Sequence, residues 1–133
     1  MTLLYIDDDA EDIEFFCDAI KNIHPTYLCL VAQNAKDGLH ILETLIPDVI
    51  FLDINMPVMN GEQFLQEYGA NKTSGKAPVL IVSTDSTLTR VSRMLELGAS
   101  GYVRKPFTPE MMREALDRVL SPEINGSAAC EPV

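Results

Sequence analysis

Short apolar runs alternate with longer segments of helical periodicity along the whole chain. The runs are rich in β-branched and aromatic side chains, which is typical of β-strands. The predicted strands are Thr2–Ile6, Tyr27–Gln33, Val49–Leu52, Val79–Val82 and Gly101–Arg104. Two of them, Val49–Leu52 and Val79–Val82, are uniformly apolar, which predicts strands that are buried on both faces of a sheet.

The segments between these runs carry apolar residues every three or four positions, the spacing of one face of an α-helix. The predicted helices are Asp9–Ile23, Ala35–Ile46, Gly61–Asn71, Thr87–Leu97 and Pro109–Leu120. Boundary residues support these limits. Asp9 and Thr108 are good N-caps, Gly98 is a plausible C-cap, and Pro47 marks the end of the second helix.

Strict alternation of strands and helices predicts an α/β fold with one parallel sheet. Right-handed crossovers then place helices on both faces, so the expected architecture is an open three-layer sandwich. We expect a single domain over residues 1–120. Residues 121–133 contain Pro, Gly, Ser and Ala without periodicity and are predicted to form a disordered tail.

Composition narrows the function classes. The 133 residues include 20 acidic and 10 basic side chains, a net charge of -10, which argues against binding to nucleic acid or to an anionic membrane surface. No apolar run approaches the roughly 20 residues that cross a bilayer, and the N-terminus does not resemble a signal peptide. The three cysteines have no metal-binding spacing, so we expect reduced thiols and a cytoplasmic protein.

Polar side chains follow the carboxyl ends of the predicted strands. In open parallel sheets, ligands and catalytic residues are found at these ends. Acids follow the first and third strands, a hydroxyl the fourth and an ammonium the fifth: Asp7, Asp8, Asp9, Asp53, Ser83 and Lys105. Two carboxylates about 5 Å apart repel each other by about 3 kcal/mol at an effective dielectric constant of about 20. A divalent cation such as Mg²⁺ would explain the cluster. The alternatives are that Asp9 is only an N-cap and that Asp7 and Asp8 belong to a solvated loop.

Four motifs at these strand ends resemble the response-regulator receiver domain of two-component signalling. They are Tyr5–Asp8, Pro47–Gly61, Pro78–Ser83 and Gly98–Phe107. The resemblance covers about residues 2–120. It implies a flavodoxin-like (βα)5 sandwich with a five-stranded parallel sheet in the order 2-1-3-4-5.

The resemblance also implies roles for single residues. Asp53 would accept the phosphoryl group. Asp7 and Asp8 would hold Mg²⁺, or Mn²⁺, together with Asp53 and the backbone carbonyl of Asn55. Lys105 would pair with Asp53 and later with a phosphoryl oxygen. The Lys105–Pro106 peptide bond would be cis.

The resemblance also implies residues that transmit the signal or set how long it lasts. Ser83 would be the switch hydroxyl that follows the phosphoryl group, and Tyr102 the aromatic side chain that changes rotamer. Asn55 and Asp85 would flank the attacking water and tune how long the phosphoryl group lasts.

The implied function is a stand-alone switch rather than a turnover enzyme. The phosphodonor would be a sensor histidine kinase or a histidine-phosphotransfer protein. The signal would pass to an unknown protein that binds the face formed by the fourth helix, fifth strand and fifth helix. A homodimer that forms on phosphorylation is a second expected contact. Basic residues of the final third either form that surface or belong to a solvated mixed-charge face: Arg90, Arg93, Arg104, Lys105, Arg113 and Arg118.

Two other classes compete with this interpretation. A haloacid-dehalogenase-type phosphatase also uses a strand-end aspartate and Mg²⁺, but it needs a second aspartate where this chain has Asn55. A flavodoxin-like mononucleotide binder needs a phosphate-binding loop after the first strand, where Asp7, Asp8 and Asp9 would repel a phosphate.

Overall fold

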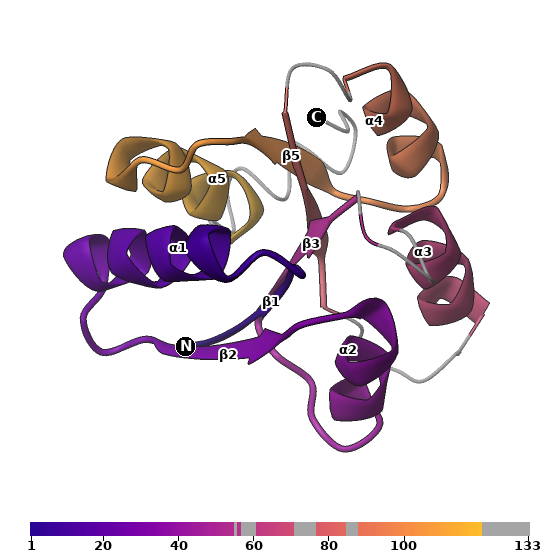
Figure 1. The fold of residues 1–133 in the computed structure, drawn as a ribbon, viewed down its shortest axis with the longest axis horizontal. Helices are drawn as coiled ribbons and strands as arrows, with labels where there is room; N and C mark the ends of the chain where they lie inside the picture. The colour runs from indigo at the N-terminus through magenta and orange to yellow at the C-terminus, as the bar shows by residue number, and fades with distance from the viewer. Residues whose placement is uncertain (55, 57–60, 71–76, 85–87, 121–133) are drawn as a thin grey trace.

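The computed structural model describes residues 1–54, 56, 61–70, 77–84 and 88–120 (Figure 1). Strands and helices alternate along these residues. In chain order they are β1 Thr2–Ile6, α1 Ala10–Ile23, β2 Leu28–Ala32, α2 Ala35–Leu42, β3 Val49–Asp53, α3 Gly61–Ala70, β4 Val79–Ser83, α4 Leu88–Glu96, β5 Gly101–Arg104 and α5 Pro109–Leu120.

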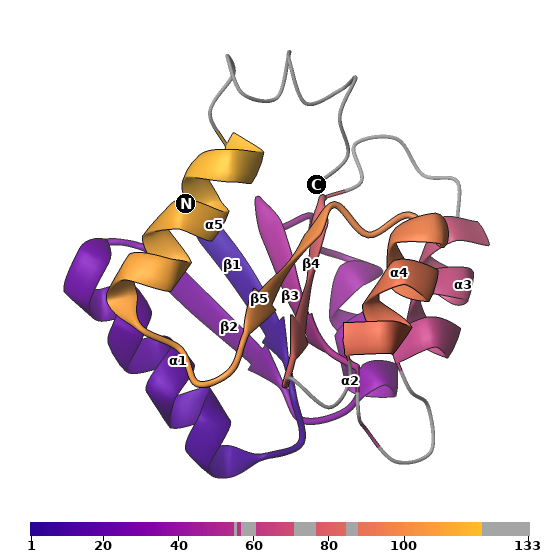
Figure 2. The same cartoon turned by 90° about the horizontal axis from the view of Figure 1, so that it is seen from above.

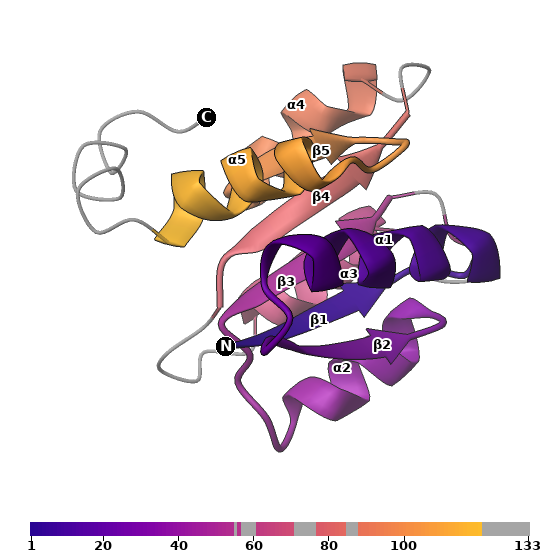
Figure 3. The same cartoon turned by 90° about the vertical axis from the view of Figure 1, so that its left-hand side faces the viewer.

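The strands form one parallel sheet in the order β2-β1-β3-β4-β5, as the sequence predicted. Helices α1 and α5 cover one face, and α2, α3 and α4 cover the other, which gives three layers (Figure 2). Seen from the side, α1 and α5 lie in front of the sheet (Figure 3). This arrangement confirms the flavodoxin-like architecture.

The alternation of side chains along the strands divides the apolar core into two parts. In β1, Leu4 and Ile6 join the cluster beneath α2, α3 and α4, whereas Leu3 and Tyr5 join the cluster beneath α1 and α5. Every residue of β3 and β4 is buried, which confirms that these strands are covered on both faces.

The caps lie where the sequence placed them. The Asp9 carboxylate accepts from the backbone N–H groups of Glu11 and Asp12, and the Thr108 hydroxyl oxygen accepts from that of Met111 at 3.1 Å. Gly98 has a φ of 113°, a conformation that favours glycine and ends α4.

The end of α2 differs from the prediction. The helix was expected to reach Ile46, but it ends at Leu42, and the Ile46 side chain is 61% exposed. The N–H groups of Glu43 and Thr44 donate to carbonyls three residues back, so the last turn is tight and does not continue. Pro47 adds to this because it disfavours a helical conformation of Ile46. The bounds of the other elements lie within one residue of the predicted ones.

None of the helices in the described part of the chain is long and apolar enough to span a lipid bilayer. Cys17 and Cys29 are free thiols, in agreement with the sequence-based expectation. Cys130 and the predicted tail, residues 121–133, lie outside the described residues, and so do Asn71 and Thr87 at the expected helix ends.

Candidate functional site

Three carboxylates meet at the carboxyl edge of the sheet. β1 and β3 are neighbours, and their register pairs Ile6 with Leu52, so the aspartates that follow these residues come out level. Carboxylate oxygens of Asp7, Asp8 and Asp53 all lie within 4.8 Å of one another. Asp7 is fully buried and Asp53 is 5% exposed, whereas Asp8 faces solvent. The cluster is therefore buried at Asp7 and Asp53 and open to solvent at Asp8.

Asp7 is fixed by three different donors. The Tyr5 hydroxyl donates to its Oδ2, the Asp9 N–H donates to its Oδ1 at 3.0 Å, and the Lys105 ammonium donates to its Oδ2 at 3.0 Å. Tyr5 is buried and stacks on Phe16 at a centroid distance of 4.3 Å. Burial, followed by the charge and hydrogen bond of Asp7, raises the pKa of Tyr5, so the hydroxyl stays protonated and remains a donor.

Lys105 joins the acidic cluster from the end of β5. Its Nζ lies 2.6 Å from Asp12 Oδ2, 3.0 Å from Asp7 Oδ2 and 3.5 Å from Asp53 Oδ1. Burial favours the neutral amine, but the hydrogen bond to Asp12 and the charges of Asp53 and Asp7 outweigh it and raise the pKa of Lys105. The ammonium is therefore charged near neutral pH and offsets part of the repulsion among the acids.

Ser83 is the last residue of β4, the strand that pairs with β3 and therefore lies beside Asp53. Its residue is 1% exposed, and its hydroxyl oxygen has no hydrogen-bond partner among the residues that the structure describes. The Lys105 N–H donates to the Ser83 carbonyl at 2.7 Å, which ties the two strand ends together. A buried hydroxyl without a partner is costly, because such a group loses its bonds to water.

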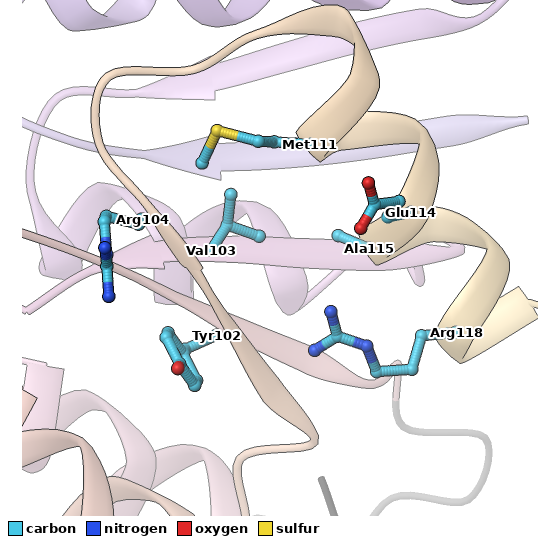
Figure 4. Close-up of a pocket in the computed structure, with 7 residues that line it drawn as sticks. All are labelled: Tyr102, Val103, Arg104, Met111, Glu114, Ala115 and Arg118. Atoms are coloured by element: carbon cyan, nitrogen blue, oxygen red, sulfur yellow. The ribbon is translucent and has the colours of Figure 1, made fainter.

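Tyr102 lies on β5, two residues before Arg104. Its ring is half-buried and packs against the apolar cluster beneath α2, α3 and α4. Beside it lies a depression of about 700 Å³ between β5 and α5. Figure 4 shows its lining residues, which are Tyr102, Val103, Arg104, Met111, Glu114, Ala115 and Arg118.

The expected basic surface divides into separate parts. Lys105 belongs to the acidic cluster, and Arg93 pairs with Glu62 of α3 at 3.0 Å. Arg90 donates to the carbonyl of Ile54, the residue after Asp53, at 3.3 Å. Arg104 and Arg118 both line the depression beside Tyr102, at opposite sides of it (Figure 4).

Sequence reasoning missed two members of the site. Tyr5 was noted only as part of a motif, although it lies two residues before Asp7 and so on the same side of β1. Asp12 was given no contact with Lys105, because the two residues are 93 positions apart and no local pattern links them. Two predicted site residues, Asn55 and Asp85, lie outside the described residues.

Comparison with known proteins gives a consistent family match. The model of the response regulator receiver domain matches residues 3–117. A chemotaxis protein CheY homolog of Campylobacter jejuni is 35% identical over 125 residues, covering 90% of this chain and 92% of that protein. The probable C4-dicarboxylate response regulator DctR of Bacillus subtilis is 34% identical over 116 residues, which cover 87% of this chain.

The relatives differ in length, and the chain spans only 50% of DctR. Among solved structures, the receiver domain of the sensor histidine kinase PA1611 of Pseudomonas aeruginosa has a TM-score of 0.78 at 18% identity. The match covers 89% of this chain and 95% of that domain. That structure has a magnesium ion coordinated in the active site cleft.

Proposed function

Because the chain belongs to the response regulator receiver domains, a family of signalling proteins, we propose that it is a phosphoacceptor switch with Asp53 as the acceptor. One observation carries this proposal. The Asp53 carboxylate ends a fully buried strand, lies 3.5 Å from the Lys105 ammonium and shares an open-sided cluster with Asp7 and Asp8. The family match leaves the phosphatase alternative without support.

The proposed reaction is phosphoryl transfer from a histidine of a sensor kinase or a phosphotransfer protein. An Asp53 oxygen attacks phosphorus, so an O–P bond forms while the P–N bond to the histidine breaks and its electron pair returns to the imidazole. The transition state is loose and spreads negative charge over the phosphoryl oxygens. Lys105 is charged and next to Asp53, and it stabilises that charge by attraction.

The donor set of the cluster suits Mg²⁺. This cation binds oxygen ligands and is typically held by one or two carboxylates together with waters and phosphate oxygens. Asp7, Asp8 and Asp53 would hold the ion, and the exposed Asp8 lies on the side from which it would enter. When bound, Mg²⁺ supplies positive charge for the phosphoryl oxygens. Mn²⁺ prefers similar ligands and stays an alternative.

A pair of isosteric variants tests the metal ligands. We expect Asp8→Asn to weaken Mg²⁺ binding by about ten-fold or more, because a site with so few carboxylates loses a direct ligand. Asp9→Asn removes the same charge one residue later, and asparagine still caps α1, so binding should change much less. Because the chain has no tryptophan, amide NMR shifts during a Mg²⁺ titration are the suitable measurement. Equal weakening in both variants would exclude a special role of Asp8.

Output is proposed to be a protein contact at the depression between β5 and α5. Tyr102 and Arg104 lie on β5, and Lys105 follows this strand directly. A movement of Lys105 therefore has a short path to this surface. A homodimer formed after phosphorylation is one form of this contact. A cytoplasmic location follows from the proposed function and stays a prediction, as do the roles of Asn55 and Asp85 in the lifetime of the phosphoryl group.

The proposal as a whole is tested by intact mass spectrometry. Incubation with acetyl phosphate or phosphoramidate and Mg²⁺ is expected to add the mass of one phosphoryl group, and a chelator should prevent the gain. A phosphatase would instead release phosphate from the donor continuously without accumulating the modified protein. If the folded protein, checked by its amide spectrum, gains no mass from either donor in the presence of Mg²⁺, the proposed function is contradicted.

A further inference from the structure

The shortest contact of Lys105 is not with the proposed phosphoacceptor. Its Nζ lies 2.6 Å from Asp12 Oδ2 and 3.5 Å from Asp53 Oδ1. Charge-assisted N–H···O bonds are typically 2.7–2.9 Å long, so Asp12 is bonded closely, whereas Asp53 is only near. Asp12 has no role in the phosphoryl transfer proposed above.

We propose that Asp12 is a positioning residue, which holds the Lys105 ammonium beside Asp53 with one side left for a phosphoryl oxygen. This inference rests on the proposed function. An ammonium has three N–H donors. Two of them are occupied by the hydrogen bonds to Asp7 and Asp12. The longer separation from Asp53 leaves the third available for the group that Asp53 would receive.

Asp12 is suited to this task because it stands outside the carboxylate cluster. Asp7 is both a partner of Lys105 and a member of the set that could hold a cation, whereas Asp12 is a partner only. A cation bound by Asp7 would compete with Lys105 for that carboxylate. The bond to Asp12 would persist, so the ammonium would keep its place in the metal-loaded site.

The surroundings make the Asp12–Lys105 contact stronger than an ordinary surface ion pair. The Lys105 side chain is 13% exposed and the Asp12 side chain 27%. Electrostatic attraction increases as water is excluded, and a surface pair would contribute little. Since a lysine side chain is long and flexible, a fixed partner reduces the number of positions that its ammonium adopts.

Asp12 is itself held in place by the start of α1. Its backbone N–H donates to Asp9 Oδ1 at 3.3 Å, and the N–H of Asp9 donates to Asp7 Oδ1 at 3.0 Å. The helix that carries Asp12 packs against α5, which follows Lys105 in the chain. Helix α1 therefore presents Asp12 at a position defined relative to both Asp7 and Lys105.

The test compares two variants of the same helical turn, Asp12→Ala and Glu11→Ala. Both remove one acid from the first turn of α1, and both backbone N–H groups donate to Asp9, but Glu11 is exposed. We expect Asp12→Ala to lower the rate constant of labelling by phosphoramidate at saturating Mg²⁺ by about ten-fold, since small displacements of catalytic groups are costly. Glu11→Ala should label at nearly the wild-type rate. Asp12→Asn should recover part of the rate, because its amide oxygen still accepts a hydrogen bond.

A second measurement does not depend on labelling. The ¹H–¹⁵N signal of the Lys105 ammonium in the metal-free protein should shift or broaden in Asp12→Ala and stay unchanged in Glu11→Ala. If Asp12→Ala labels as fast as the wild type, or faster, the positioning role is wrong. An unchanged Lys105 signal overturns it as well. Failure of the wild-type protein to be labelled would instead contradict the proposed function, so the two results are distinguishable.

Discussion

Replacement of Asp53 by asparagine is expected to abolish the gain of a phosphoryl group while the fold persists. The exchange removes the attacking oxygen anion but keeps nearly the same shape at a position that is 5% exposed. It also removes one charge from a mutually repulsive cluster, so the unfolding free energy of the metal-free protein should rise by about 1 kcal/mol. Intact mass after incubation with phosphoramidate and Mg²⁺, and a urea titration, measure the two effects.

Asp9→Asn is the matched control, because Asp9 is an exposed acid of the same rim that caps α1 and lies outside the carboxylate cluster. It should gain a phosphoryl group like the wild type. If Asp53→Asn is labelled to the same extent as the wild type, the acceptor is a different residue. Peptide mapping of the labelled protein would then identify which carboxylate receives the group.

Ser83→Ala is expected to separate labelling from signalling. The Ser83 hydroxyl is buried without a partner among the described residues, so it can donate to a phosphoryl oxygen on the neighbouring Asp53 without breaking another bond. A hydrogen bond to a charged group contributes about 1.5–3 kcal/mol. That free energy is enough to shift a two-state equilibrium by about 10–150-fold, the usual scale of allosteric coupling. The variant should therefore be labelled but lose most of the conformational response.

Amide NMR shifts across α4, β5 and α5, with and without a beryllofluoride mimic of the phosphoryl group, measure this response. Ser92→Ala serves as the control because Ser92 lies on the exposed side of α4. It should respond like the wild type. A full wild-type displacement of α4 and Tyr102 in Ser83→Ala would exclude the hydroxyl as the link between Asp53 and the surface.

These effects share a short structural route. β5 carries Tyr102 and Arg104 and is followed directly by Lys105, whose N–H is bonded to the carbonyl of Ser83. The two proposed partners of a phosphoryl oxygen, the Ser83 hydroxyl and the Lys105 ammonium, are thus connected through the backbone. We therefore expect a change at either one to reach β5, which lines the depression beside α5.

The sequence by itself determined the α/β sandwich, the strand order through the family resemblance, and the rim at which the acids collect. The reason is local: strand and helix periodicities differ, and the carboxyl ends of parallel strands meet at one edge. The uniformly apolar runs Val49–Leu52 and Val79–Val82 also indicated that Asp53 and Ser83 come at the ends of buried strands. The predicted end of α2 was wrong, because the apolar spacing continues to Ile46 beyond the last helical hydrogen bonds.

Only the tertiary structure decided how the charges are distributed within that rim. Asp12 reaches Lys105 because α1 packs beside α5, and the Tyr5 hydroxyl reaches Asp7 because both point to the same side of β1. The contact of Asp12 has no sequence pattern of its own, since an acid in the first turn of a helix ordinarily serves the helix dipole and faces solvent. The contact of Tyr5 has only the two-residue spacing of a strand, which places the two side chains on one side without showing that they bond. Distances between side chains on elements far apart in the chain depend on packing, and packing determined that Lys105 lies closer to Asp12 than to Asp53.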